Sequence, residues 1–173
     1  MERGCIHIYC GNGKGKTTAG MGLCLRAAGH GMRVGIAQFL KPGNSGELVI
    51  LKQQPNVQLL PFLPDVKFTV AMTEREKRDA KEFYASLLEH IRAQADHFDV
   101  LLLDEVFAAL STGLLDSQAL VSFLRGRPEP LEVILTGRNP PAEVLELADY
   151  ISEVQPVRHP FEHGVAARKG IEW

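Results

Sequence analysis

A glycine-rich run near the N-terminus carries the residue types that hold phosphate groups. It reads Cys10-Gly11-Asn12-Gly13-Lys14-Gly15-Lys16-Thr17-Thr18 and follows a short β-prone segment. Glycines at alternate positions let successive backbone N–H groups turn toward one anion, and a helix that starts after the loop adds the positive end of its dipole. A lysine supplies a mobile charge, and a threonine hydroxyl supplies a ligand for Mg²⁺. The run therefore predicts a triphosphate site rather than a turn without a ligand.

The loop departs from the usual phosphate-loop pattern, G-x-x-x-x-G-K-[ST], by one position. The first glycine of that pattern falls on Cys10, so Gly11 lies one residue nearer to Gly15 than the pattern asks. We interpret Cys10 as a small buried residue at the mouth of the loop rather than as a catalytic thiol. The loop is either an ordinary nucleotide-hydrolysing loop with a substitution or one that holds a nucleotide for another reaction.

Two acids follow a continuous apolar run in the second half of the chain. Asp104 and Glu105 come directly after residues 100–103, a run typical of a central parallel strand buried on both faces. An acid at the end of such a strand binds Mg²⁺ directly or through water, as in a Walker B element. Together with the loop, the pair predicts a nucleoside triphosphate bound with Mg²⁺.

Other polar residues follow predicted strands or lie near the loop. Arg138 would meet a phosphate or stack on a base, unless it is a solvated turn arginine. Residues 41–47 follow another predicted strand and are a further place for ligand contacts. Arg26, near the end of the first predicted helix, is as compatible with a surface role as with a ligand contact. We interpret His7 as a core histidine with a hydrogen-bonding partner.

The elements that must position these residues alternate between strand and helix. Strands are predicted at residues 6–10, 33–40, 57–62, 99–105, 131–136 and 150–156, and helices at 17–28, from 73 onward, at 116–124 and at 141–148. This alternation predicts an α/β fold of the P-loop (RecA-like) type, a mostly parallel sheet with helices on both faces. Ligands of such sheets bind beyond the carboxyl ends of the strands, where the candidate residues lie.

The helix that begins near Thr73 has the clearest pattern in the chain. Thr73 and Glu76 have capping-box spacing. The apolar residues that follow recur every three or four positions and therefore form one face, which we expect to pack on the core rather than to bind a partner. They are Ala80, Phe83, Tyr84, Leu87, Leu88, Ile91 and Ala95.

Composition sets limits on the class of protein. The 173 residues, 45% of them apolar, predict one domain spanning 1–173. A formal net charge of -2 argues against a nucleic-acid partner, and three cysteines are too few for a disulfide framework, so we expect a cytoplasmic protein with free thiols. No apolar run has the length of a membrane span, so we expect no membrane partner.

The order and spacing of the motifs closely resemble the P-loop class of ATP:corrinoid adenosyltransferases. The match runs from about Ile6 to the final residue. The motifs that carry it are Gly11-Asn12-Gly13-Lys14-Gly15-Lys16-Thr17-Thr18, Arg26-Ala27-Ala28-Gly29-His30-Gly31, Val34-Gly35-Ile36-Ala37-Gln38-Phe39, Leu103-Asp104-Glu105, Ile134-Leu135-Thr136-Gly137-Arg138, Ala148-Asp149, His159-Pro160-Phe161, Gly164-Val165 and Lys169-Gly170-Ile171-Glu172-Trp173.

The resemblance implies a reaction that composition does not indicate. In that family a corrinoid with cobalt in the Co(I) state attacks the 5′-carbon of ATP, a cobalt–carbon bond forms and inorganic triphosphate leaves. The cobalt is the nucleophile, which is consistent with a sequence in which no general base can be identified. The family holds ATP in a reversed sense, so that the 5′-carbon faces the corrinoid.

The resemblance also implies roles for individual residues. The glycine-rich loop would cradle the triphosphate through Gly11, Asn12, Gly13, Lys14, Gly15, Lys16, Thr17 and Thr18. Lys16 would neutralise the leaving group, and Thr17 and Glu105 would hold Mg²⁺, with Asp104 nearby. Arg26 and Arg138 match positions near the nucleotide. A flavodoxin-like or flavin reductant and a homodimer are expected from the same resemblance.

The sequence departs from the family at two places. Members often carry a longer N-terminal arm over the active site, whereas about five residues precede the first predicted strand here. Members commonly have Phe-Thr-Trp after the third strand, where both aromatics press on the corrinoid; this chain has Phe68-Thr69-Val70. Phe68 is therefore an expected corrinoid contact, and Val70 predicts weaker removal of the lower axial ligand of cobalt, with a preference for a precursor that lacks this ligand or dependence on a partner.

Two other functions fit the loop and the acids. A P-loop ATPase or phosphotransferase would release ADP instead of triphosphate. A non-catalytic nucleotide- or corrinoid-binding carrier would bind ATP without turnover.

Overall fold

Six parallel strands form one sheet in the computed structural model, which describes residues 3–64, 66–67 and 69–172. The strand order is β3-β2-β4-β5-β1-β6, and every neighbouring pair is parallel. The strands are β1 (Ile6–Cys10), β2 (Val34–Gln38), β3 (Val57–Leu59), β4 (Val100–Asp104), β5 (Glu132–Thr136) and β6 (Tyr150–Glu153). The predicted α/β class is confirmed.

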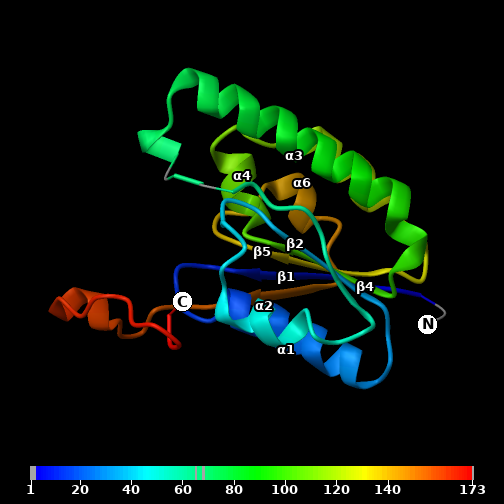
Figure 1. The fold of residues 1–173 in the computed structure, drawn as a ribbon, viewed down its shortest axis with the longest axis horizontal. Helices are drawn as coiled ribbons and strands as arrows, with labels where there is room; N and C mark the ends of the chain where they lie inside the picture. The colour runs from blue at the N-terminus through cyan, green and yellow to red at the C-terminus, as the bar shows by residue number, and fades with distance from the viewer. Residues whose placement is uncertain (1–2, 65, 68, 173) are drawn as a thin grey trace.

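Helices cover both faces of the sheet (Figure 1). On one face lie α1 (Lys16–Gly29) and α2 (Gly46–Leu51). On the other lie α3 (Glu74–Gln94), α4 (Val106–Ser111), α5 (Ser117–Gly126) and α6 (Ala142–Leu145). Short 3₁₀ turns occur at Thr69–Ala71, Ala95–His97 and Pro160–His163, and the segment after β6 extends to one side of the sheet in Figure 1.

The central strands are buried on both faces because alternate side chains enter two separate cores. In β4, Leu101 and Leu103 pack in the core under α3, while Val100 and Leu102 pack in the core under α1. All five residues of β4 are buried, which explains why its sequence is a continuous apolar run rather than an alternating one. The edge strand β6 is exposed along its length.

The long helix α3 forms as its pattern predicts. Its N-cap is Thr73, whose hydroxyl accepts a hydrogen bond from the Glu76 N–H at 3.2 Å, while the Glu76 carboxylate accepts one from the Thr73 N–H at 2.7 Å. The predicted stripe faces the core: Ala80, Tyr84, Leu87, Leu88, Ile91 and Ala95 are buried, and Phe83 is partly buried against them. The stripe is therefore core packing, as expected.

The structure differs from the sequence expectations mainly in short elements. Helices α2 and α4 were not predicted, since each is six residues long and too short to show a helical period. Strand β3 ends at Leu59 instead of residue 62, and β6 ends at Glu153 instead of residue 156. Within the described part of the chain, no helix is long and apolar enough to cross a membrane.

Replacing Thr73 by alanine removes the side-chain half of the α3 cap. We expect Thr73→Ala to lower the free energy of unfolding by about 1 kcal/mol and the midpoint of thermal unfolding by about 2–4 °C. Thr73→Ser keeps a hydroxyl at the N-cap and serves as the control. Equal urea midpoints for the alanine variant and the parent would contradict this role of the cap.

Candidate active site

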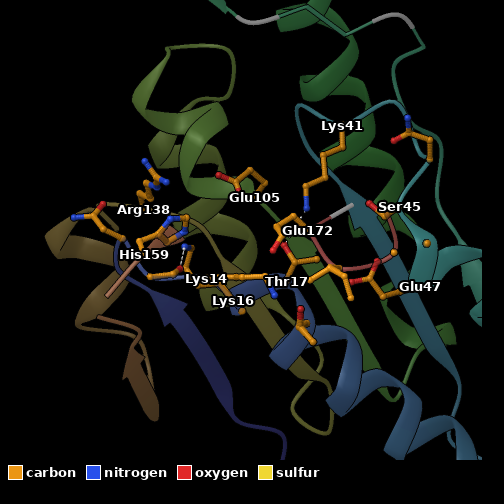
Figure 2. A pocket seen from close by; sticks show the side chains of 18 residues that line it. Lys14, Lys16, Thr17, Lys41, Ser45, Glu47, Glu105, Arg138, His159 and Glu172 are labelled. Carbon is orange, nitrogen blue, oxygen red and sulfur yellow. Dashed lines mark hydrogen bonds between the residues drawn. The ribbon is translucent and has the colours of Figure 1, made fainter. Parts of the chain in front are cut away.

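A pocket of about 700 Å³ opens at the carboxyl ends of the strands. It has the size usual for small-molecule sites. Figure 2 shows side chains from the glycine-rich loop, the segment after β2, the end of β4 and the segment after β5 around this space. The lining residues are Asn12, Gly13, Lys14, Gly15, Lys16, Thr17, Thr18, Lys41, Asn44, Ser45, Gly46, Glu47, Glu105, Arg138, His159, Gly170, Ile171 and Glu172.

The loop between β1 and α1 has a shape that only glycine allows at several positions. Gly15 has φ +110° and lies at the N-cap of α1. A Cβ on Gly11 would lie 2.5 Å from the Val154 carbonyl oxygen, and one on Gly13 would lie 2.8 Å from it. The Gly13 N–H donates to that same oxygen at 2.7 Å. Glycine at position 15 therefore allows the positive φ of the loop, whereas the glycines at positions 11 and 13 leave room for the loop to pack against the end of β6.

Lys16 sits inside a cluster of positive charge. Its ammonium donates to the Gly13 carbonyl at 2.8 Å, within its own loop. Burial lowers the pKa of Lys16, and the charges of Arg138 and Lys41 lower it further, against the opposite effect of Glu105. The positive charges gathered around Lys16 give the pocket an electrostatic preference for a bound anion.

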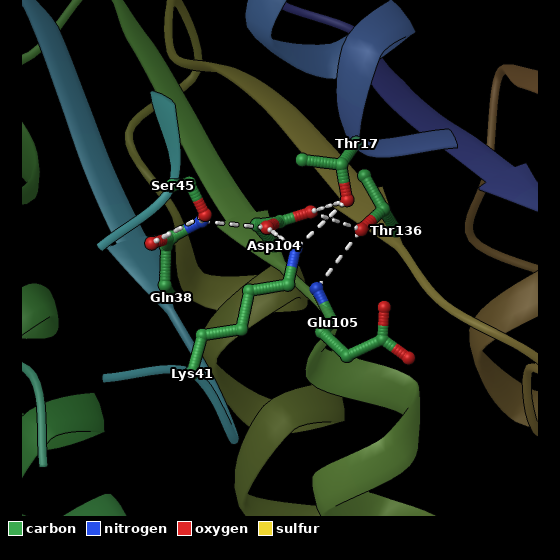
Figure 3. Close-up of polar contacts among 7 residues, drawn as sticks. All are labelled: Thr17, Gln38, Lys41, Ser45, Asp104, Glu105 and Thr136. Atoms are coloured by element: carbon green, nitrogen blue, oxygen red, sulfur yellow. Dashed lines mark hydrogen bonds and ion pairs between the residues drawn. The ribbon is translucent and has the colours of Figure 1, made fainter. Parts of the chain in front are cut away.

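The carboxylate of Asp104 is completely buried at the end of β4 and is held by hydrogen bonds from several elements (Figure 3). On Oδ1 it accepts from the Thr17 hydroxyl at 2.9 Å and the Thr136 hydroxyl at 2.7 Å. On Oδ2 it accepts from the Gln38 amide at 3.0 Å and the Lys41 ammonium at 2.7 Å. The glycine-rich loop, β2, β4 and β5 are thereby tied together at one buried charge.

Glu105 adopts an unusual backbone conformation that separates it from its neighbour Asp104. Its φ of +60° is in the left-handed region, which costs a residue with a side chain conformational energy. Its N–H donates to the Thr136 hydroxyl at 2.9 Å, and Glu105 lines the pocket. The two adjacent acids therefore have different surroundings: Asp104 is enclosed, and Glu105 is accessible from the pocket.

The oxygen donors at the base of the pocket fit a magnesium ion in their chemistry. Thr17 provides a hydroxyl, and Asp104 and Glu105 provide carboxylates, which are the ligand types that Mg²⁺ prefers. The Lys41 ammonium lies 2.9 Å from Thr17 Oγ1 and 2.7 Å from Asp104 Oδ2. These two oxygens therefore bind a positively charged group in this structure. Across the residues that are described, no cluster of three or more His, Cys, Asp or Glu side chains could hold a metal. A site of so few protein ligands suits Mg²⁺, which usually relies on substrate phosphates.

The structure brings most of the predicted site residues together. Asn12 to Thr18, Glu105 and Arg138 line the pocket, and Asp104 lies directly behind Thr17. Gly11 is not a lining residue and instead contacts the end of β6. Arg26 is exposed in the last turn of α1, outside the residues that form the pocket, so the structure gives it no contact there.

Other expectations concern residues that are not among those lining the described pocket. Phe68 lies outside the described residues, and Val70, two positions later, is 98% exposed. Cys10 is buried at the end of β1, and burial raises the pKa of its thiol, which argues against a reactive thiolate. His7 is mostly buried and hydrogen-bonds with Glu132 while its ring stacks on Tyr150. Both were expected to be structural.

Other residues of the site were not assigned a role from the sequence. Lys41 was included only as part of a segment after a strand, and its contact with Asp104 joins positions 63 apart in the chain. Thr136 was noted beside Arg138, but its bridging hydroxyl was not predicted. Glu172 and His159 come from the C-terminal segment and line the pocket. The only sequence signal for these two was their place in the resemblance to a family.

A parallel α/β sheet with a glycine-rich loop and a cationic pocket at its carboxyl edge is typical of nucleotide-binding α/β proteins. The family model described as "ATP:corrinoid adenosyltransferase BtuR/CobO/CobP" matches residues 2–173. The chain therefore belongs to this family, and it is an enzyme that transfers the adenosyl group of ATP to a reduced corrinoid.

Individual relatives agree with the family model. The corrinoid adenosyltransferase of Escherichia coli (strain K12) is 37% identical over 175 residues, which cover 99% of this chain and 87% of that protein. The corrinoid adenosyltransferase CobA of Salmonella typhimurium (strain LT2) is 37% identical over 180 residues, with the same coverage. The corrinoid adenosyltransferase of Pseudomonas aeruginosa is 33% identical over 174 residues, which cover 99% and 85% of the two chains.

Proposed function

We propose that the pocket binds ATP as its Mg²⁺ complex and stabilises triphosphate as the leaving group. The Co(I) centre of the corrinoid attacks the 5′-carbon with its electron pair, the cobalt–carbon bond forms, and the carbon–oxygen bond breaks. The electron pair of the broken bond leaves with the triphosphate. The observation that carries this proposal is the convergence of Lys14, Lys16, Lys41 and Arg138 with the glycine-rich loop on one pocket of about 700 Å³.

The residues of the chain act on charge and position. Backbone N–H groups of the loop from Lys14 onward hold the phosphate oxygens, while the Gly13 N–H stays bonded to Val154, and Lys16 neutralises charge that develops on the leaving triphosphate. Thr17, Glu105 and Asp104 would hold Mg²⁺, which when bound shields the negative charge of the phosphates. Since the corrinoid supplies the nucleophile, no side chain needs to remove a proton before the attack. Lys16, Thr17 and Glu105 are accordingly the proposed catalytic residues.

The remaining features of the enzyme are proposed from its likeness to the family. The chain acts as one domain over residues 1–173, in a homodimer, with a flavodoxin-like or flavin donor as the source of electrons for cobalt. The free thiols of Cys5, Cys10 and Cys24 support a reducing compartment and so a cytoplasmic location. Arg138, at the pocket, contacts the triphosphate in this proposal; Arg26 and Phe68 are kept as proposed contacts from the resemblance alone.

One assay tests the proposed reaction. The protein is mixed with ATP, Mg²⁺, a corrinoid and a strong reductant, the visible spectrum is followed, and the phosphate product is identified. We expect a new light-sensitive alkylcobalt species and one equivalent of triphosphate. ADP with an unchanged corrinoid would instead indicate an ATPase or phosphotransferase. Binding of ATP with no turnover would indicate a carrier.

Lys16 is the proposed residue whose loss affects the reaction most. We expect Lys16→Ala to lower kcat by about 10²–10³-fold, because the charge on the leaving triphosphate then lacks the Lys16 ammonium. Lys81→Ala, on the exposed surface of α3, is the matched control for the loss of a lysine. Near-normal turnover of Lys16→Ala would show that the loop does not hold the triphosphate as proposed.

Val70 tests the expectation about the lower axial ligand of cobalt. Because Val70 is 98% exposed, a larger side chain fits there without disturbing the core. We expect Val70→Trp to raise turnover on complete cobalamin by roughly two- to tenfold, the range of one aromatic contact. Turnover on a precursor that lacks the lower ligand should change much less. Unchanged rates on both substrates would exclude this role for position 70.

A further inference from the structure

The side chain of Lys41 occupies the point between two of the proposed metal ligands. Its ammonium donates to Asp104 Oδ2 at 2.7 Å and to Thr17 Oγ1 at 2.9 Å (Figure 3). A divalent cation bound by both residues would need the same oxygens. In this structure Lys41 therefore takes the place of the cation that the site would otherwise attract.

The carboxylate of Asp104 has no acceptor capacity left for a metal. A carboxylate offers about four lone-pair positions. Thr17 and Thr136 use Oδ1, and Gln38 and Lys41 use Oδ2. A divalent cation can bind Asp104 directly only after one of these four donors has moved away.

Lys41 is the donor that can move at the least cost. Thr136 and Gln38 are 0% and 3% exposed and lie on strands inside the sheet. Thr17 is fixed in the first turn of α1. The Lys41 side chain is 26% exposed, ends a flexible carbon chain and lines the pocket (Figure 2).

The backbone next to Lys41 is anchored, so only the Lys41 side chain needs to move when its ammonium leaves Asp104. Leu40 has φ +52°, an unusual value for a residue with a side chain. Its N–H donates to the Tyr84 hydroxyl at 2.9 Å, and Tyr84 is completely buried in α3. Rotation of the Lys41 side chain can then exchange its partners without a change in the loop.

The charge balance ties this exchange to the nucleotide. If the ammonium left alone, the buried Asp104 carboxylate would lose its only direct ion pair among the described residues. If a divalent cation arrived alone, Lys41 would be displaced toward a pocket that already holds Lys14, Lys16 and Arg138. A triphosphate in the pocket removes both obstacles, because its oxygens accept the Lys41 ammonium and add ligands to the metal.

We propose that the Lys41 ammonium acts as a resident cation at the Thr17–Asp104 site. It keeps this site from binding divalent cations until a nucleoside triphosphate draws the ammonium into the pocket. The proposal rests on the metal site named in the proposed function. Its consequence is cooperativity: Mg²⁺ binds weakly to the free protein and tightly with ATP, and the metal and the nucleotide strengthen each other's binding by the same factor. Lys41 is thus a positioning residue that couples the two ligands.

The test measures metal binding without turnover. Mn²⁺ is titrated into the nucleotide-free protein, and free Mn²⁺ is followed by electron paramagnetic resonance. We expect Lys41→Met, which keeps the length but removes the charge, to bind Mn²⁺ about ten- to a hundredfold more tightly than the parent, the factor expected when a hydrogen bond to a charged group no longer competes. Lys81→Met is the matched control and should bind Mn²⁺ as the parent does. Equal Mn²⁺ affinity in Lys41→Met and the parent would overturn the proposal.

Thermal unfolding provides a second readout that also reports on folding. Without metal, Lys41→Met should unfold at a lower temperature than the parent, and Mg²⁺ alone should restore it, whereas the unfolding temperature of the nucleotide-free parent should not respond to Mg²⁺. If Lys41→Met does not fold, Lys41→Gln, which keeps a hydrogen-bond donor, is used in both experiments. An equal response of the parent and the folded variant to Mg²⁺ would contradict the proposal.

A third arm separates failure of this inference from failure of the proposed metal site. With ATP present, the Asp104→Asn variant should bind Mn²⁺ more weakly than the parent protein does. If Asp104→Asn leaves the Mn²⁺–ATP complex unchanged, the proposed metal site is wrong and the inference falls with it. If Asp104→Asn weakens that complex while Lys41→Met shows no gain without nucleotide, only the role of Lys41 is wrong.

Discussion

The buried carboxylate of Asp104 is the constraint on which the arrangement of the site depends. It is completely enclosed at the end of the central strand β4, where an uncompensated negative charge is strongly unfavourable. Its four hydrogen-bond donors come from α1, β2, the segment after β2, and β5. The need to satisfy this charge therefore fixes the distance between the glycine-rich loop and three neighbouring strand ends.

The two adjacent acids differ in how far their carboxylates are buried. Asp104 is held by protein donors, whereas Glu105 has φ +60° and an N–H bonded to Thr136, which leaves its carboxylate at the pocket. Thr136 bonds to both residues, donating its hydroxyl proton to Asp104 and accepting the N–H of Glu105. One buried hydroxyl thus sets the orientation of the enclosed acid and of the accessible one.

The sequence predicted the parts of the structure whose cause is local. The apolar run of β4, the period of α3 and the capping box at Thr73 each follow from neighbouring residues, and all three formed. Contacts between distant segments left no such signal: Lys41 and Asp104 meet because β2 and β4 are neighbours. Arg26 is the opposite case, since it is close to the loop in the sequence but distant from it in the structure. It lies ten residues after Lys16 in one helix, and a rise of about 1.5 Å per residue places it about 15 Å along the axis from the loop.

The shifted glycine of the loop has a physical cause in the structure. Cys10, at the position where the usual pattern has its first glycine, is the last residue of β1, and its carbonyl accepts the Val154 N–H at 2.8 Å. The backbone of Cys10 is therefore paired as part of a strand, a conformation that does not require glycine. The chain first leaves the strand at Gly11, where φ is +98° and a Cβ would collide with Val154. The spacing of the glycines is thus set by where β1 stops pairing with the chain that continues β6. The loop is bonded to that chain through the Gly13 N–H on one side and to Asp104 through the Thr17 hydroxyl on the other, so the protein's own contacts fix its backbone at both ends.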